Sequence, residues 1–227
     1  MGETITLTAG DGFQLGAYVA TPTEEPQKGG VVVVQEIFGV NRHIREVCDW
    51  FAHAGYKAIA PAIFDRTEPG FESGYSEEEI KKARSFIANP DFDQMLMDVG
   101  AAKAVLAEEG PVAVVGYCLG GSLAFAAATR MHGLAAAVGY YGGKVKAFAD
   151  EKPMCPVMLH FGETDQSIPM EDVEEVRRKR PEVELYVYPA GHGFNCDHRS
   201  AYEPESARIA GERTLAFLDK HVGAYQV

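Results

Sequence analysis

The sequence predicts an α/β protein in which a mostly parallel central sheet carries helices on both faces. From residue 31 onward, strand-like apolar segments alternate with helix-like segments, as parallel strands joined by crossover helices require. Val31–Val34 is β-branched throughout, which is typical of a strand buried on both faces. The chain has 227 residues and is 46% hydrophobic, so one domain over residues 1–227 is expected.

The first part of the chain is expected to form a β-hairpin and the outer strands and helices of this sheet. Ile5–Thr8 alternates apolar and polar residues, Asp11-Gly12 forms a turn, and Phe13–Val19 returns. A polar surface loop over residues 22–30 then leads into the strand at Val31–Val34. The next elements are a helix over His43–Ala54 capped by Asn41, a strand over Tyr56–Ala60, a loop over residues 61–75 and a helix from Ser76 toward Asn89. Ser76 and Glu79 have the spacing of a capping box.

The second part continues the alternation of helix and strand to the end of the chain. Pro90 separates the helix before it from the next one. The expected elements are a helix over Phe92–Leu106, a strand over Val112–Val115, a helix from Ser122, strands over Ala135–Tyr141 and Val157–Phe161, a helix over Met170–Arg180, an edge strand over Val183–Tyr188 and a helix over residues 203–221.

Composition narrows the class of partner. The net charge is −12, from 21 basic and 33 acidic residues, which argues against nucleic acid and anionic membranes. The N-terminal segment has no basic start and no apolar signal core, so a cytoplasmic protein is expected, as a monomer or weak homodimer. The four cysteines have no regular spacing and are expected to be free thiols.

The hexapeptide Gly116-Tyr117-Cys118-Leu119-Gly120-Gly121 is the most informative segment. It lies between an apolar strand and a helix, with glycines flanking a central nucleophile, which is the pattern of a nucleophile elbow. The nucleophile is Cys118, and the backbone N–H of Leu119, the next residue, is expected to stabilise an oxyanion.

Three further strand ends carry polar groups that can act with Cys118. Glu36 follows Val31–Val34, Asp165 follows the strand over Val157–Phe161, and His192 follows the last strand. Because parallel strands gather functional groups at their carboxyl ends, these residues are expected near the elbow. The order nucleophile, acid, histidine is that of the α/β-hydrolases. Glu163 is an alternative to Asp165 as the carboxylate that orients the histidine.

Metal and cofactor sites are not expected. His192, Cys196 and His198 lie within seven residues, but the sequence offers no second cluster with a fourth ligand. The Gly-rich phosphate-binding patterns GxGxxG after a strand and GxxxxGK[ST] are both absent.

These motifs together resemble the dienelactone hydrolase family of the α/β-hydrolase superfamily, over nearly the whole chain. The segments that carry the resemblance are Gln35–Asn41, Gly116–Gly121, Val138–Gly142, Gly191–Phe194 and Glu212–Leu218. The resemblance implies an α/β-hydrolase fold and hydrolysis of a dienelactone to maleylacetate, a reaction of aromatic degradation.

The resemblance also assigns roles to residues. Cys118, His192 and Asp165 would form a catalytic triad, and the N–H groups of Leu119 and Ile37 would form the oxyanion hole. Glu36 would hold the Cys118 thiol in a neutral resting pose until substrate arrives. Arg66 and Phe38 would bind the substrate.

One position departs from the family pattern. Cys196 stands where a second substrate-binding arginine is expected, four residues after the histidine, and Arg199 in the same loop is a candidate to replace it.

The resulting hypothesis is a cysteine-dependent hydrolase that opens a carboxylate-bearing enol-lactone through an acyl-thioester. Two alternatives stay open at this point. One is a broader carboxylic ester hydrolase with a different small substrate, and the other is a non-hydrolytic thiol, redox or ligand-binding protein on a hydrolase scaffold.

Overall fold

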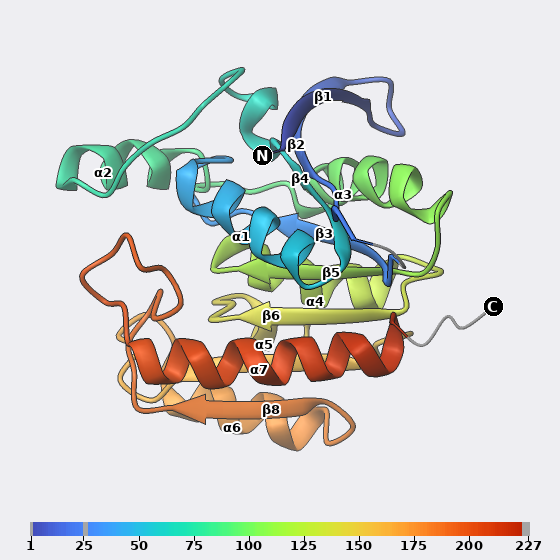
Figure 1. Cartoon of the computed structure of the whole chain (residues 1–227). Helices are drawn as coiled ribbons and strands as arrows, with labels where there is room; N and C mark the ends of the chain where they lie inside the picture. The colour runs from blue at the N-terminus through green and yellow to red at the C-terminus, as the bar shows by residue number, and fades with distance from the viewer. Residues whose placement is uncertain (1, 25–26, 224–227) are drawn as a thin grey trace.

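An eight-stranded sheet runs through the molecule and positions every element around it (Figure 1). The structure is a computed structural model that describes residues 2–24 and 27–223. Residues 1 and 224–227 of the expected domain, and residues 25–26 of the expected surface loop, lie outside the described residues.

The sheet is antiparallel at one edge and parallel elsewhere, as expected. Its strand order is β1-β2-β4-β3-β5-β6-β7-β8; the β1–β2 and β2–β4 pairs are antiparallel and the other pairs are parallel. The strands are β1 Glu3–Thr8, β2 Gln14–Ala20, β3 Gly29–Val34, β4 Tyr56–Pro61, β5 Val112–Tyr117, β6 Ala136–Tyr140, β7 Val157–Gly162 and β8 Glu184–Tyr188. The predicted hairpin and the predicted edge strand are therefore confirmed.

Helices cover both faces of the sheet. In Figure 1, α1 and α7 cross the near face, and α3 and α4 lie behind the strands. The helical elements are α1 Arg42–His53, η1 Ile63–Arg66, α2 Glu77–Ser85, α3 Phe92–Ala107, α4 Leu119–Arg130, α5 Val145–Phe148, α6 Met170–Lys179 and α7 Pro204–His221. No helix in residues 2–24 and 27–223 combines the length and the apolar character needed to cross a membrane.

Helices α1 and α2 begin at the capping residues that the sequence predicted. The side chain of Asn41 accepts a hydrogen bond from the N–H of Ile44 at the start of α1. Ser76 and Glu79 form the reciprocal capping box at the start of α2. These side chains satisfy N–H groups that have no acceptor within the helix.

Local structure differs from the expectation in three places. Helix α2 ends at Ser85 instead of continuing toward Asn89, and the ring of its C-cap residue Phe86 packs edge-on against Phe64 and Phe71. The expected loop over residues 61–75 contains the short helix η1, and the segment after β6 contains the short helix α5. Within η1, Asp65 accepts hydrogen bonds from the N–H groups of Gly16 and Gly70, and these bonds hold the short helix in place.

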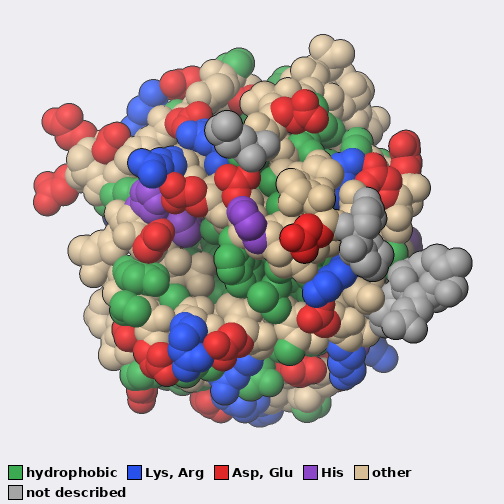
Figure 2. Space-filling view, in the orientation of Figure 1, with side chains coloured by type: hydrophobic (Ala, Val, Ile, Leu, Met, Phe, Trp, Pro, Cys, Tyr) green, Lys and Arg blue, Asp and Glu red, His purple; other side chains and the backbone are tan. Residues whose placement is uncertain are grey.

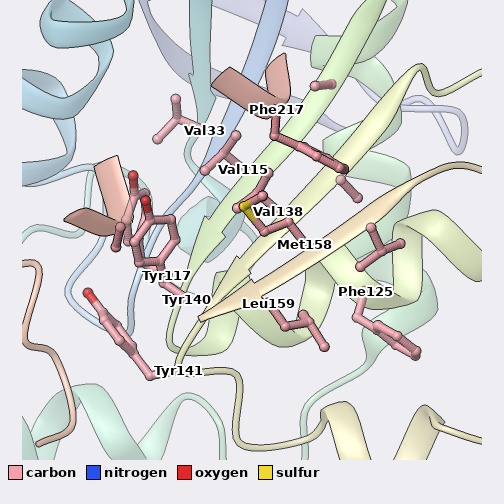
Figure 3. Close-up of a cluster of buried hydrophobic side chains, with 14 of the residues drawn as sticks. Val33, Val115, Tyr117, Phe125, Val138, Tyr140, Tyr141, Met158, Leu159 and Phe217 are labelled. Atoms are coloured by element: carbon pink, nitrogen blue, oxygen red, sulfur yellow. The ribbon is translucent and has the colours of Figure 1, made fainter. Parts of the chain in front are cut away.

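The central strands carry apolar residues on both faces because both faces are buried. Val31–Val34 is fully buried between the helices of the two layers. Tyrosines Tyr117, Tyr140 and Tyr141 lie together at the carboxyl ends of β5 and β6, beside the aliphatic core (Figure 3).

The order in which the chain adds strands to the sheet reverses direction at β3. The chain leaves β3 for β4 on one side and later enters β5 on the other side of β3. In doubly wound sheets the crevice at such a reversal, at the carboxyl ends of the strands, is where ligands bind. The segments after β3 and β5, which contain Glu36 and Cys118, meet there.

A buried histidine predicts how stability depends on pH. His160 on β7 is fully buried and bonds the hydroxyl groups of Tyr188 and Thr214. Burial, reinforced by the charge of Arg213, lowers the pKa of His160 from 6.5 to about 3. Between those two values the unfolded chain binds a proton that the folded protein does not, so the free energy of unfolding should fall as the pH falls, by about 1.4 kcal/mol per pH unit at most for this group.

We therefore expect His160→Gln to flatten the dependence of urea unfolding on pH between about 6.5 and 3, since the side chain no longer titrates. The exposed His132 provides the matched variant His132→Gln, which should leave the slope unchanged. Equal slopes in the wild type and in His160→Gln would contradict the assignment.

Candidate active site

Steric crowding of the backbone fixes the position of Cys118 between β5 and α4. A Cβ atom on Gly116 would lie 1.9 Å from the carbonyl oxygen of Gly120, and one on Gly120 would lie 2.2 Å from that of Val34. Both distances are far inside van der Waals contact, so only glycine fits. Cys118 itself has φ 56° and ψ −112°, in the region that residues with side chains rarely occupy. The turn is the strained elbow that the sequence predicted.

A continuous hydrogen-bonded chain links Cys118 to a buried carboxylate. His192 Nε2 lies 3.1 Å from Cys118 Sγ, and His192 Nδ1 lies 2.7 Å from Asp165 Oδ2. The other oxygen of Asp165 accepts the N–H of Ser167 at 2.7 Å. Because the carboxylate only accepts, Nδ1 carries a proton and Nε2 is left to face the thiol. Glu163, the alternative to Asp165, is exposed and has no part in this chain.

The electrostatic environment favours a protonated His192. Burial alone would lower the pKa of its imidazole, but hydrogen bonds to Asp165 and Cys118, together with the charges that those groups can carry, raise the pKa to about 10. A raised pKa means that the imidazolium formed by taking the proton of Cys118 is stabilised where it forms. The contact therefore suits transfer of a proton between Cys118 Sγ and His192 Nε2.

Glu36 is paired with an arginine and does not contact the thiol. Its side chain is 1% exposed, and Arg199 Nη1 donates to Oε1 at 2.9 Å. The carboxylate of Glu36 is therefore buried and is not solvated, although it follows the end of a strand. The expected resting contact with Cys118 is also not observed in the described residues, because Glu36 is held by the opposite charge of Arg199 while the thiol faces His192.

The candidate residue Arg199 reaches the site across the histidine loop. A Cβ atom on Gly193 would lie 2.3 Å from Arg199 Nη1, so the guanidinium passes directly over this glycine. Its Cζ lies 5.5 Å from the ring centroid of Phe38 and 6.0 Å from that of Tyr75. The predicted substrate-binding residue Phe38 thus lies beside Arg199 and helps to hold the guanidinium in place.

The two predicted oxyanion donors come from segments that touch. Leu119 is the first residue of α4, so its N–H has no acceptor within the helix. Ile37 follows Glu36, and the N–H of Gly120 donates to the carbonyl oxygen of Gln35 at 3.1 Å, which joins the two segments. The segments that carry these two N–H groups are therefore joined to each other next to Cys118.

The structure does not bring Arg66 to this cluster, which corrects the expectation. Its guanidinium is already committed to two carboxylates, with Nε and Nη2 donating to Asp98 at 2.8–3.1 Å and both terminal nitrogens donating to Asp11. Asp98 is fully buried, so it needs this partner. Arg66 is a structural cation that joins the β1–β2 turn to α3.

Tyr141 lies at the site and was not singled out from the sequence. It has φ 38°, its ring centroid lies 5.2 Å from that of His192, and its buried hydroxyl has no hydrogen-bond partner. Its only signal in the sequence is its place in Val138–Gly142 at the end of β6, because backbone strain cannot be read from residue types.

Cys196 and His43 are the other residues brought close to Glu36. Cys196 is buried, its Sγ contacts the hydroxyl of Tyr75 at 3.4 Å, and burial raises the pKa of the thiol to about 11. His43 on α1 is also buried, and its pKa is lowered by burial. His43 was assigned only to a helix by the sequence, since its role depends on how α1 packs.

Comparison with known proteins agrees with this fold. The model of the dienelactone hydrolase family matches residues 15–222. The carboxymethylenebutenolidase of Pseudomonas putida is 33% identical over 95% of both chains, and carboxymethylenebutenolidase 1 of Cupriavidus pinatubonensis is 31% identical over 96% of this chain and 97% of its own. A crystal structure of a protein from Klebsiella pneumoniae that is named as a dienelactone hydrolase has a TM-score of 0.85 at 29% identity, and the match covers 97% of this chain and 99% of that chain.

The hydrogen bond from His192 to Asp165 can be tested directly. We expect Asp165→Asn to lower the pKa of His192, because an amide supplies no negative charge to stabilise the imidazolium. Titration of the His192 ring protons by NMR measures this pKa. The exposed neighbour Glu163 provides the control Glu163→Gln, which should leave it unchanged. An unchanged titration in Asp165→Asn would exclude Asp165 as the partner.

Proposed function

This chain belongs to the dienelactone hydrolase family and is a hydrolase of ester or lactone bonds, and we propose that it opens a carboxylate-bearing enol-lactone with Cys118 as the nucleophile. The observation that carries the proposal is the hydrogen-bonded chain from Asp165 through His192 to Cys118. Dienelactone, opened to maleylacetate, is the substrate that best fits this reading.

Acylation begins with transfer of the Cys118 proton to His192 Nε2. The thiolate attacks the lactone carbonyl carbon, and the carbonyl oxygen becomes an oxyanion that the N–H groups of Leu119 and Ile37 stabilise. As the tetrahedral intermediate collapses, the ring C–O bond breaks and the enol oxygen leaves with the proton from His192. Because the substrate is cyclic, its enol stays attached to the acyl group as the thioester forms.

Deacylation uses the same groups with water. His192 takes a proton from a water molecule, whose oxygen attacks the thioester carbonyl carbon. The C–S bond then breaks, and the proton returns from His192 to Cys118. Asp165 keeps its charge throughout and stabilises the imidazolium in both halves of the reaction.

Arg199 is the cation that best fits the substrate carboxylate. It is the guanidinium already inside the cluster, whereas Arg66 is bound to Asp98 and Asp11. A substrate carboxylate would compete with Glu36 for this guanidinium and form the charge-assisted hydrogen bonds that arginine favours. Glu36 would then lose its partner Arg199, so binding of the substrate would change the charges around Cys118.

We expect Cys118→Ala to reduce hydrolysis of dienelactone and of p-nitrophenyl acetate by about 10³-fold or more, since it removes the nucleophile. Spectrophotometric turnover measures the loss, and a mass increase of the wild type after brief exposure to substrate reports acylation. Cys155→Ser is the matched control, because Cys155 is a free thiol outside the site and should be dispensable. Undiminished turnover of Cys118→Ala would refute the nucleophile assignment.

We expect Arg199→Met to raise KM for a carboxylate-bearing lactone by about 10- to 100-fold, the value of a lost charge-assisted contact. The methyl ester of the same lactone should be affected far less, so the ratio of the two kcat/KM values isolates the carboxylate contact from general damage to the site. Arg208→Met, which removes an exposed arginine on α7, should preserve the ratio. If Arg199→Met also preserves it, Arg199 is not the anchor.

A further inference from the structure

Three metal-ligating side chains from separate parts of the chain converge beside the catalytic cluster. A carboxylate oxygen of Glu36, a ring nitrogen of His43 and Cys196 Sγ all lie within 4.8 Å of one another, and all three residues are buried. Glu36 follows β3, His43 lies in α1, and Cys196 lies in the loop after β8. The fold, not local sequence spacing, brings them together.

Two of these side chains have buried polar atoms without partners. Glu36 Oε2 and His43 Nε2 accept or donate no hydrogen bond, and the residues are 1% and 4% exposed. Because His43 Nδ1 lies 3.5 Å from Asp197 Oδ1, Nε2 is the nitrogen that stays free for another contact. Unpartnered polar atoms in a low-dielectric interior are costly, and one cation among them would satisfy both.

The donor set suits a borderline divalent metal. A thiolate, an imidazole and a carboxylate are the ligand types of zinc sites, with bond lengths of about 2.0–2.3 Å. Ligand atoms around a tetrahedral ion are roughly 3.2–3.8 Å apart, so rotations that move these atoms by about 1 Å would close the site. Three protein ligands leave a fourth position for water.

Side chains next to the three ligands would stabilise their metal-bound form. The hydroxyl of Tyr75, which already accepts a hydrogen bond from Asn41, can donate its proton to a Cys196 thiolate. Arg199 occupies only Oε1 of Glu36 and leaves Oε2 available. With Glu36 and Cys196 ionised, their two negative charges face a divalent ion and the guanidinium of Arg199, so the bound site carries one net positive charge.

The surface next to the cluster is hollowed and carries further potential ligands. His43, Asp197 and His198 form a second group of potential ligands, of which Asp197 is exposed. A hollow of about 380 Å³ lined by residues that include Asn41, His43, Tyr75 and His198 opens at the same place. Figure 2 shows histidine side chains gathered among charged groups on this face of the molecule. The hollow therefore adjoins one of the three buried ligands, His43, which also belongs to the surface group.

We propose that Glu36, His43 and Cys196 bind one Zn²⁺ ion beside the catalytic triad. On binding, the Cys196 S–H bond breaks, its proton passes to water and a Zn–S bond forms, with no change of oxidation state. This departs from the sequence expectation that no metal site exists, which considered Cys196 only with the histidines near it in sequence. The bound ion would fix Glu36 and thereby act on the hydrolase without being part of its mechanism.

The test uses the full chain with Cys118→Ala as the background, so that the catalytic thiol cannot be the ligand. Titration with Co²⁺ is followed by absorption, because a sulfur-to-cobalt charge-transfer band appears only when a thiolate coordinates, and Zn²⁺ affinity is measured by competition with a chromophoric chelator. We expect one ion per chain. Cys196→Ser should abolish the charge-transfer band, and Cys196→Ser and His43→Gln should each weaken Zn²⁺ binding by about 100-fold, because even partners outside the coordination shell contribute 10- to 100-fold.

Controls separate this site from its neighbours. Cys155→Ser and His198→Ala should retain binding, and circular dichroism confirms that each variant is folded. Absence of the charge-transfer band in the background protein would overturn the proposal. Binding that survives Cys196→Ser but is lost in His198→Ala would overturn it too, since the ion would then belong to the surface group.

Discussion

The close approach of α4 to the sheet is the constraint on which the active site depends. Gly120 lies against the backbone of β3, and a Cβ atom on Gly121 would lie 2.3 Å from the carbonyl oxygen of Tyr140 in β6. Backbone contact on both sides leaves the chain one path from β5 into the helix, and that path forces the positive φ of Cys118. The thiol therefore stands at the crevice between β3 and β5, where the later strand ends can deliver Asp165 and His192 to it.

The buried carboxylate of Glu36 is the second constraint on the site. Burying the carboxylate of Glu36 carries a large desolvation cost that only a cation or strong donors can offset. Arg199 supplies the cation, and its guanidinium lies over Gly193 and beside the ring of Phe38. The loop after β8 is thus tied to the segment after β3, and because it also carries His192, the pairing of Glu36 with Arg199 helps to hold His192 in place.

What the sequence could predict follows from the range of the forces involved. The sheet, the helix caps and the elbow depend on periodicity and on residues adjacent in the chain, so they were predictable, and the geometry resolves the choice between Glu163 and Asp165. Side-chain pairings across the fold were not predictable. Arg66 matches the family pattern in sequence, yet Asp98 on α3 binds it, and only the packing of α3 against η1 reveals that partner.

Residues 196 and 199 lie in the same loop, and this chain departs there from the family pattern in the position of its arginine. The resemblance places an arginine at position 196, where this chain has a thiol in contact with Tyr75. The backbone N–H of Arg199 donates to the carbonyl oxygen of Cys196, so the loop turns back, and the side chain of Arg199 reaches the carboxylate of Glu36. Arg199 thus supplies the positive charge that the buried Glu36 requires. The elbow is therefore fixed by backbone sterics, whereas this loop is fixed by side-chain pairing, so residues of the loop can be exchanged without changing the path of the backbone at Cys118.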